Sequence, residues 1–66
     1  MSRRVMVISA DGKYIKSYPS VKECAFAEGQ KYETIGDNIR KGSLNEQTNH
    51  FYDYEIDWVD YGNDAK

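Results

Sequence analysis

Hydrophobic and polar positions alternate in short segments along the 66-residue chain, which predicts a small domain of strands and helices. Residues 4–9 (RVMVIS) are apolar and β-branched, which favours a strand. Asp11-Gly12 follows, and an Asp-Gly pair between two such segments predicts a tight hairpin, because both residues tolerate positive φ. Residues 13–18 (KYIKSY) return as the second strand, which Pro19 ends because it cannot donate to a strand ladder.

The second strand of this hairpin allows two interpretations. In the first, Ile15 faces the core while Tyr14, Lys16 and Tyr18 lie on the opposite, solvent-exposed face. In the second, the alternation of Lys13, Tyr14, Lys16 and Tyr18 forms a surface for nucleic acid, because bases stack on aromatic rings and lysines attract phosphates. The sequence leaves both interpretations open.

A helix is expected over residues 21–28. Ser20 and Glu23 have the spacing of a capping box, in which the Ser hydroxyl accepts from the amide three residues on and the Glu carboxylate reaches back to the Ser amide. Gly29 is well placed as the left-handed residue that ends the helix. The spacing puts four residues on one face, namely Val21, Cys24, Ala25 and Glu28.

A second helix is expected over residues 32–41, and Gly42 ends it. Its apolar residues have the spacing of a buried stripe, and they are Tyr32, Ile35 and Ile39. Gly36 within this helix costs about 1 kcal/mol relative to Ala, which predicts either tight packing at that position or a shorter helix. Residues 29–31 are the only connection, and a short glycine-containing turn between helices is typical of a helix-turn-helix.

The last predicted element is a strand over residues 50–59, after a loop over 43–49. Aromatic and acidic residues alternate strictly in this segment, which predicts a half-buried strand with an acidic outer face. The inward residues are Tyr52, Tyr54, Ile56 and Trp58, and the outward ones are Asp53, Glu55 and Asp57. Residues 60–66 are expected to form a flexible tail. The sequence therefore predicts one α+β domain over residues 1–66, with the order ββααβ.

Composition restricts the chemistry. Cys24 is the only cysteine and His50 the only histidine, so we expect no internal disulfide, no catalytic residues, no metal site and no cofactor. Cys24 lies on the apolar face of its helix, where a small buried hydrophobe is expected. The lack of disulfide pairs, of a leader and of a long apolar run favours a cytoplasmic, non-membrane protein. The lack of a catalytic residue set predicts that the chain is not an enzyme.

Charge is distributed unevenly along the chain. Residues 1–45 hold eight basic and five acidic residues, a balance of +3, whereas residues 46–66 hold one basic and six acidic residues, a balance of −5. The first part could therefore meet phosphates, which the second part would repel. Arg3 and Arg4 add a short basic arm of the kind that can enter a groove of DNA.

The order of these elements resembles two related families, the intron-encoded nuclease repeat and the modular (NUMOD-type) DNA-binding domains of homing endonucleases, which phages often carry. The resemblance spans residues 5–58 and rests on two stretches, Ser20-Val21-Lys22-Glu23-Cys24-Ala25 and Ile35-x-x-x-Ile39-Arg40-Lys41-Gly42. The chain departs from the families at residues 30–34, where a Ser/Thr-rich stretch is usual, and in its acidic last strand. It lacks a Gly-Ile-Tyr start and a histidine pair, so the resemblance does not imply cleavage.

The resemblance implies a non-catalytic module that binds double-stranded DNA, with the second helix in the major groove. Asn38 would then read adenine, whereas Glu33 and Asp37 would oppose the phosphates. Backbone contacts by lysine and arginine would give most of the affinity. The full set of implied DNA-binding residues is Lys13, Lys16, Lys22, Lys31, Thr34, Asn38, Arg40 and Lys41.

Two other hypotheses come from the last strand and from the sheet. A row of carboxylates on a rigid strand can imitate a phosphate backbone, so the chain could be a phage effector that inhibits a host nucleic-acid-binding protein. That surface would consist of Asp53, Glu55, Asp57 and Asp60. The third hypothesis is a homodimer that pairs through an exposed sheet edge. Under the phage hypotheses the protein works in the host cytoplasm.

Overall fold

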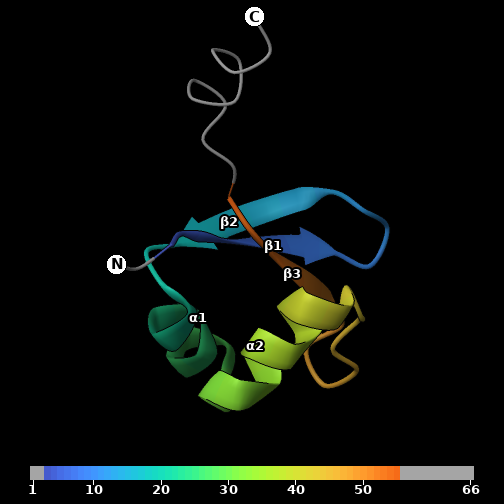
Figure 1. Ribbon diagram of the computed structural model, residues 1–66. Helices are drawn as coiled ribbons and strands as arrows, with labels where there is room; N and C mark the ends of the chain where they lie inside the picture. The colour runs from blue at the N-terminus through green and yellow to red at the C-terminus, as the bar shows by residue number, and fades with distance from the viewer. Residues whose placement is uncertain (1–2, 56–66) are drawn as a thin grey trace, which may run out of the picture.

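The computed structural model describes residues 3–55, which form a three-stranded antiparallel sheet with two helices on one of its faces (Figure 1). The elements in chain order are β1 (Val5–Ser9), β2 (Tyr14–Tyr18), α1 (Val21–Glu28), α2 (Tyr32–Lys41) and β3 (His50–Tyr54). The strand order is β2-β1-β3, so the first strand lies in the middle. The predicted ββααβ order and α+β class are confirmed. The predicted strand beyond residue 55 and the predicted tail lie outside the described residues. No helix in the described part is long and apolar enough to cross a membrane.

The core lies between the sheet and the helices. Val5 and Val7 of β1 are fully buried, because β1 is the central strand and its odd positions face the helices. The other buried apolar residues are Val21, Cys24, Ala25, Ile35 and Tyr52, with Tyr18, Ile39 and Tyr54 packed against them. Each element therefore contributes at least one side chain to a single core.

The hairpin corrects the expectation that Ile15 belongs to the core, because Ile15 is 42% exposed. The pairing of β1 with β2 shifts between Val7 and Ile8, so Tyr18 lies opposite Val5 while Tyr14 lies opposite Ile8. Opposed residues share a face of the sheet, so this irregularity puts Tyr18 on the helix-covered face and Tyr14 on the other. The strict alternation of Tyr14, Lys16 and Tyr18 was therefore a wrong prediction.

The turn of this hairpin is wider than the Asp-Gly pair predicts. The Ser9 amide donates to Lys13 (2.7 Å) and the Gly12 amide to Ser9 (2.9 Å), and of the turn residues Gly12 has positive φ (90°) while Asp11 does not. This is the pattern of a turn in ordinary geometry followed by one left-handed glycine. The extra residue in the turn accompanies the shifted pairing of β2.

Helix α1 begins and ends where the sequence predicts. The Ser20 hydroxyl accepts from the Glu23 amide (3.2 Å), and Gly29 is left-handed with φ of 69°. The return bond from the Glu23 carboxylate is not formed among the described residues. Phe26 points away from the core and is 89% exposed, because its position lies off the buried face of this short helix.

Helix α2 also has the predicted bounds, but its buried stripe is narrower. Ile35 is fully buried and Ile39 packs against the core, whereas Tyr32 is 59% exposed at the first turn, where the helix extends past the core. Gly36 is in the middle of a full-length helix, and no atom lies within 4 Å of where its Cβ would be. Both explanations that the sequence offered for Gly36 are therefore wrong.

Candidate nucleic-acid interface

Helix α2 has two polar sides of different charge. Lys31, Thr34, Asn38 and Lys41 are spaced three or four residues apart, so they follow one side of the helix. Glu33, Asp37 and Arg40 have the same spacing on another side. Arg40 there forms an ion pair with Asp37. Of the carboxylates that were expected to oppose phosphates, Asp37 thus lies one turn before Lys41 and is paired with Arg40, while Glu33 lies away from Lys31 and Thr34.

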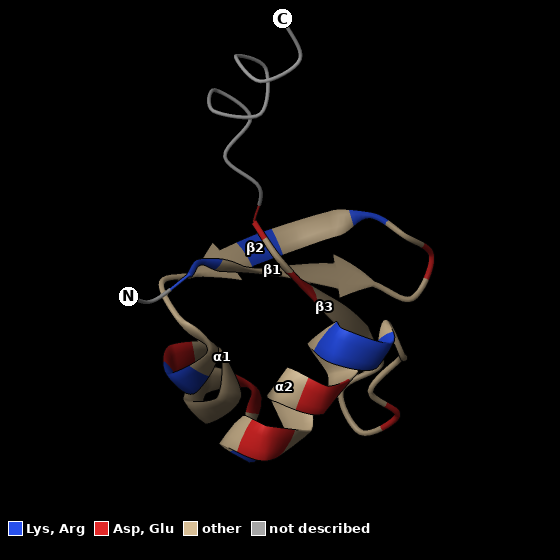
Figure 2. Cartoon of the chain, viewed as in Figure 1, with Lys and Arg blue, Asp and Glu red and all other residues tan. Residues whose placement is uncertain are grey.

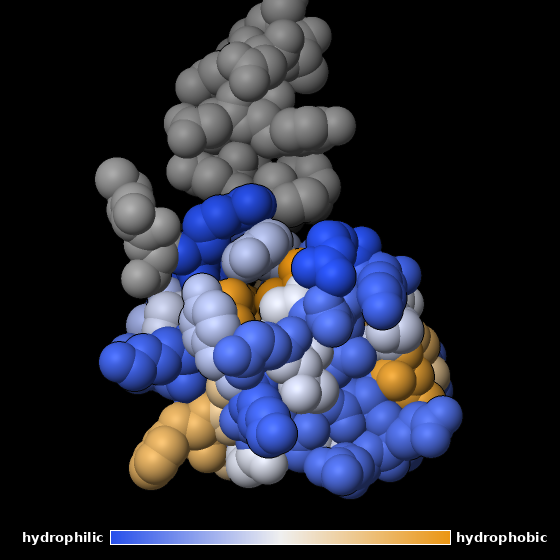
Figure 3. All heavy atoms as spheres, turned by 60° about the horizontal axis from the view of Figure 1, so that its bottom comes forward, coloured by the Kyte–Doolittle hydropathy of each residue, from blue (hydrophilic) through white to orange (hydrophobic). Residues whose placement is uncertain are grey.

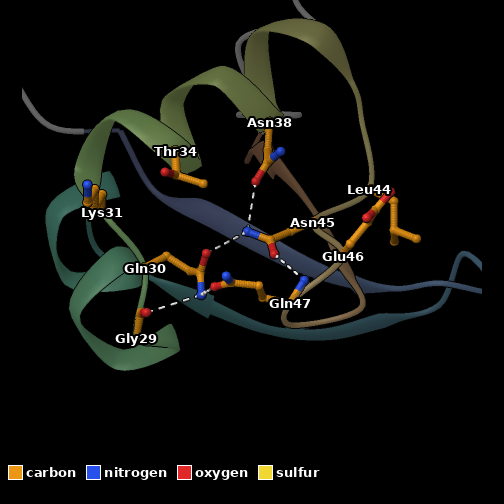
Figure 4. Close-up of a pocket in the computed structure, with 9 residues that line it drawn as sticks. All are labelled: Gly29, Gln30, Lys31, Thr34, Asn38, Leu44, Asn45, Glu46 and Gln47. Atoms are coloured by element: carbon orange, nitrogen blue, oxygen red, sulfur yellow. Dashed lines mark hydrogen bonds between the residues drawn. The ribbon is translucent and has the colours of Figure 1, made fainter.

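The first of these sides borders an open recess between α2 and the loop that follows it (Figure 4). Thr34 and Asn38 extend into this recess from the helix, while Asn45 and Gln47 reach it from the loop. Lys31 lies at its edge, at the start of α2. Carboxamide side chains dominate the lining, and these groups both donate and accept hydrogen bonds. The recess therefore presents polar groups with little net charge.

Asn45 is the centre of the hydrogen bonds in this recess and is 5% exposed. Its Oδ1 accepts from the amides of Gln47 (2.9 Å) and Thr48 (3.1 Å), which fixes the turn of the loop. Its Nδ2 donates to Gln30 Oε1 and to Asn38 Oδ1, both at 3.0 Å. A buried carboxamide is costly unless its groups are paired, and here both are. Asn45 therefore ties the loop to α2 and to the turn between the helices.

Asn38 takes part in this network rather than pointing freely to solvent. Its Oδ1 accepts from Asn45, and its Nδ2 donates to the Ser43 hydroxyl (3.2 Å). Reading an adenine would require both the oxygen and the nitrogen of the amide. Each atom already has one partner within the protein and keeps capacity for one further bond, so the reading of adenine by Asn38 stays a prediction.

The remaining basic residues are dispersed over the surface (Figure 2). Lys13 and Lys16 are exposed on the hairpin, and Lys22 is exposed on α1. Lys16 extends over the ring of Tyr18, with Nζ 5.6 Å from the ring centre. Figure 2 shows basic positions on β2, on α1 and at the end of α2, with acidic positions between them on both helices. The basic positions along the chain are therefore interrupted by acidic ones on both helices.

A second polar cluster anchors the end of α1 to the sheet. Glu28 Oε1 accepts from Tyr52 (2.9 Å) and lies 3.0 Å from His50 Nδ1, and its Oε2 accepts from Tyr18 (3.2 Å). Burial alone raises the pKa of Glu28, but the hydrogen bonds from these three side chains outweigh burial and lower it below the usual value. Burial and the neighbouring Glu28 raise the pKa of Tyr18, so its hydroxyl keeps its proton and donates. This cluster is structural, because its groups bond to one another.

Cys24 lies next to this cluster and is fully buried. Burial, together with the smaller effect of the Glu28 charge, raises the pKa of its thiol to about 12. The thiolate is the reactive form, so this cysteine behaves as a small hydrophobic residue. Within residues 3–55, no group of three or more His, Cys, Asp or Glu side chains could hold a metal ion.

The acidic strand face is partly neutralised where the structure describes it. Asp53 is exposed on β3, whereas Glu55 accepts from Arg4 (2.7 Å) in an ion pair. The guanidinium of Arg3 lies over the ring of Tyr54, 4.0 Å from its centre. The expected basic arm is therefore folded against β3. Asp57 and Asp60 lie outside the described residues.

The surface on the helix side is mostly hydrophilic, with apolar atoms protruding on the side where α1 lies (Figure 3). On α1, Phe26 is the most exposed large apolar side chain of the described residues, and it borders a shallow recess with Tyr18, Lys22 and Ala27. The described residues show nothing that covers it.

Sequence reasoning missed the residues that build the recess. Gln30, Asn45 and Gln47 were assigned to loops without a role, because periodicity describes only regular elements. A signal was present, since residues 43–49 (SLNEQTN) are rich in side chains that bond to neighbouring backbone groups. Asn45 is the clearest of them, because its side-chain oxygen accepts from the amides of Gln47 and Thr48. Asn49 adopts positive φ (62°), which asparagine tolerates, and its main-chain amide donates to the Asn45 carbonyl (2.7 Å).

Comparison with known proteins finds a structural relative but no sequence family. No family model matches the chain, and no curated protein matches it. The fold is similar to part of the HNH homing endonuclease I-HmuI, in a structure described as showing DNA binding and cleavage by that enzyme. The TM-score is 0.67 at 23% identity, over 85% of this chain and 31% of the other.

This likeness establishes a fold of the kind found within a homing endonuclease, and the chain spans about a third of that protein's length. The fold that the resemblance implied is therefore confirmed. Membership of the intron-encoded nuclease repeat or of the NUMOD-type family stays a prediction.

Proposed function

We propose that the chain is a small non-catalytic module that binds duplex DNA through the lysine-bearing side of α2 and the adjoining loop over residues 43–49. The observation that carries the proposal is the position of Lys31 and Thr34 on the side of α2 that borders the recess, which polar side chains of the loop continue. Glu33 and Asp37 do not line this recess. Asp37 lies one turn before Lys41, and its charge there is partly neutralised by Arg40.

Two further features support this proposal. The N-terminus of α2 has no side-chain cap, so its first amides are open to an anion next to Lys31. The fold is that of a segment of a homing endonuclease for which DNA binding is described. Glu46, which also lines the recess, would weaken phosphate contacts but is able to accept a hydrogen bond from cytosine.

Lys13, Lys16 and Lys22 enter the proposal as flanking contacts to the phosphate backbone, since all three are exposed. Arg40 enters it as a weaker contact, because Asp37 already neutralises part of its charge.

The acidic-effector alternative has less support. Of its four carboxylates, Glu55 is already paired with Arg4. No observation among the described residues favours pairing of two copies through the sheet edge, so the homodimer stays a prediction, as do a phage origin and a cytoplasmic location.

The test is binding of the protein to a 20-base-pair duplex, measured by fluorescence anisotropy across a series of KCl concentrations. The affinity of the wild-type protein should fall linearly on a log–log plot of affinity against salt, because bound phosphates release counterions. Lys31→Ala with Lys41→Ala should weaken binding about tenfold at low salt and reduce the slope by about two, one for each lost phosphate contact.

A matched control makes the same change of charge on the hairpin, as Lys13→Ala with Lys16→Ala. It should have the smaller effect, because those residues are flanking contacts. No binding at low salt would refute the function. A loss confined to the hairpin variant would place the DNA on the sheet side and refute the proposed surface.

A further inference from the structure

The amide groups in the recess form a chain of hydrogen bonds whose direction is fixed by the backbone. The amides of Gln47 and Thr48 can only donate, so the Asn45 atom that they contact must be the oxygen Oδ1. The Nδ2 of Asn45 must therefore point to the other side, where it meets Gln30 and Asn38.

The same argument fixes the next amide in the chain. Since Asn45 Nδ2 donates to Gln30 Oε1, the opposite end of the Gln30 amide is its nitrogen. Gln30 Nε2 donates to the Gly29 carbonyl (3.1 Å) and to Gln47 Oε1 (3.0 Å). The Gly29 carbonyl can only accept, so it confirms this orientation independently. Both hydrogens of Gln30 Nε2 are thus used.

The chain of bonds ends at Gln47, whose side chain is exposed at the recess (Figure 4). Its Oε1 accepts one bond from Gln30 and has capacity for a second. Its Nε2 has no partner within residues 3–55. Gln47 therefore presents an acceptor and a donor side by side, held in one orientation by Gln30.

We propose that Gln47 is a specificity-determining residue that reads an adenine in the groove of the DNA bound by α2. The inference rests on the proposed DNA-binding function. In the major groove adenine offers an acceptor, N7, beside a donor, the N6 amino group, and a glutamine amide matches both at once. Pre-oriented groups lose less freedom on binding than mobile ones. Lys31 and Thr34 lie across the same recess, where they can hold the phosphates that flank the base.

The experiment selects binders from a pool of duplexes with a randomised central segment and compares the wild-type protein with Gln47→Ala and Gln47→Glu. The wild-type protein should enrich A·T at one position about tenfold or more, as one bidentate contact provides. Gln47→Ala should lose the preference at that position alone. Gln47→Glu should shift it toward C·G, because a carboxylate accepts from the amino group of cytosine.

Glu46→Ala is the matched control, since Glu46 is the adjacent exposed residue of the same loop and lines the same recess. It should keep the preference of the wild-type protein. Every variant retains the main-chain amides that Asn45 binds, and circular dichroism checks that the fold is unchanged.

Two results would overturn the inference while the proposed function stands. One is salt-dependent binding by the wild-type protein with no enriched base pair. The other is an enriched pair that Gln47→Ala leaves intact. Absence of binding to any duplex at low salt would instead refute the proposed function, and the inference with it.

Discussion

The two helices of this domain differ in how firmly the fold holds them. Helix α1 is capped by Ser20, buries three of its residues and is joined to two strands through Glu28. Helix α2 has no side-chain cap and buries Ile35 alone, so most of its surface remains polar and accessible. The comparison teaches that α1 is tied to the sheet by polar bonds as well as by burial, while α2 is held chiefly by Ile35 and presents polar side chains along the recess.

The largest expected effect is the loss of the anchor of α1. Glu28→Ala leaves Tyr18, Tyr52 and His50 without their shared acceptor, and hydrogen bonds to a charged group are the strong ones. The free energy of unfolding should fall by roughly 3 kcal/mol, measured by urea denaturation followed by circular dichroism.

Glu33→Ala is the matched control on α2, because it removes the same side chain from an exposed position. It should change the free energy of unfolding by less than about 1 kcal/mol. If Glu28→Ala does not fold, the milder Glu28→Gln takes its place. Equal losses in the free energy of unfolding for Glu28→Ala and Glu33→Ala would contradict the conclusion that α1 is held more firmly than α2.

Lowering the pH should also weaken the contacts of Glu28, because it protonates the carboxylate. The pKa of Glu28 is lowered in the folded protein, so its contribution is fully present above the ordinary value of 4.5 and is lost as the pH falls through the lowered folded value. The difference in stability between the wild-type protein and Glu28→Gln should therefore shrink as the pH is lowered from 7 to 3. A series of urea midpoints measures it, and a difference that stays constant would contradict the role of the Glu28 charge.

The smallest predicted effects concern two glycines, one at the end of α1 and one within α2. Gly36→Ala should stabilise the protein by about 1 kcal/mol, because Gly36 is helical and an added Cβ meets no atom within 4 Å. Gly29→Ala should destabilise it by about 1 kcal/mol, because φ of 69° strains any residue with a Cβ. Thermal unfolding measures both, and the same sign for the two substitutions would show that the backbone conformation at these sites does not decide the effect.

The capping residues and the alternation of apolar and polar positions in the sequence determined the helices and strands. Ser20, Gly29 and Gly42 set the bounds of the helices, and alternation set the described part of β3 together with its buried residue Tyr52. These features depend on residues close together in the chain, so pattern and capping rules are sufficient to find them. The same rules predicted the ββααβ order correctly.

Only the tertiary structure decided which polar residues meet. The shift in pairing of β1 with β2 placed Tyr18 rather than Ile15 toward the core, and a loop residue, Asn45, became the buried link between Gln30 and Asn38. These contacts join segments separated along the chain, so no local pattern encodes them. The proposed role of Gln47 depends on these contacts. Backbone amides orient the side chain of Asn45, which orients that of Gln30, which in turn orients that of Gln47. These three side chains meet only when the loop folds against the helices.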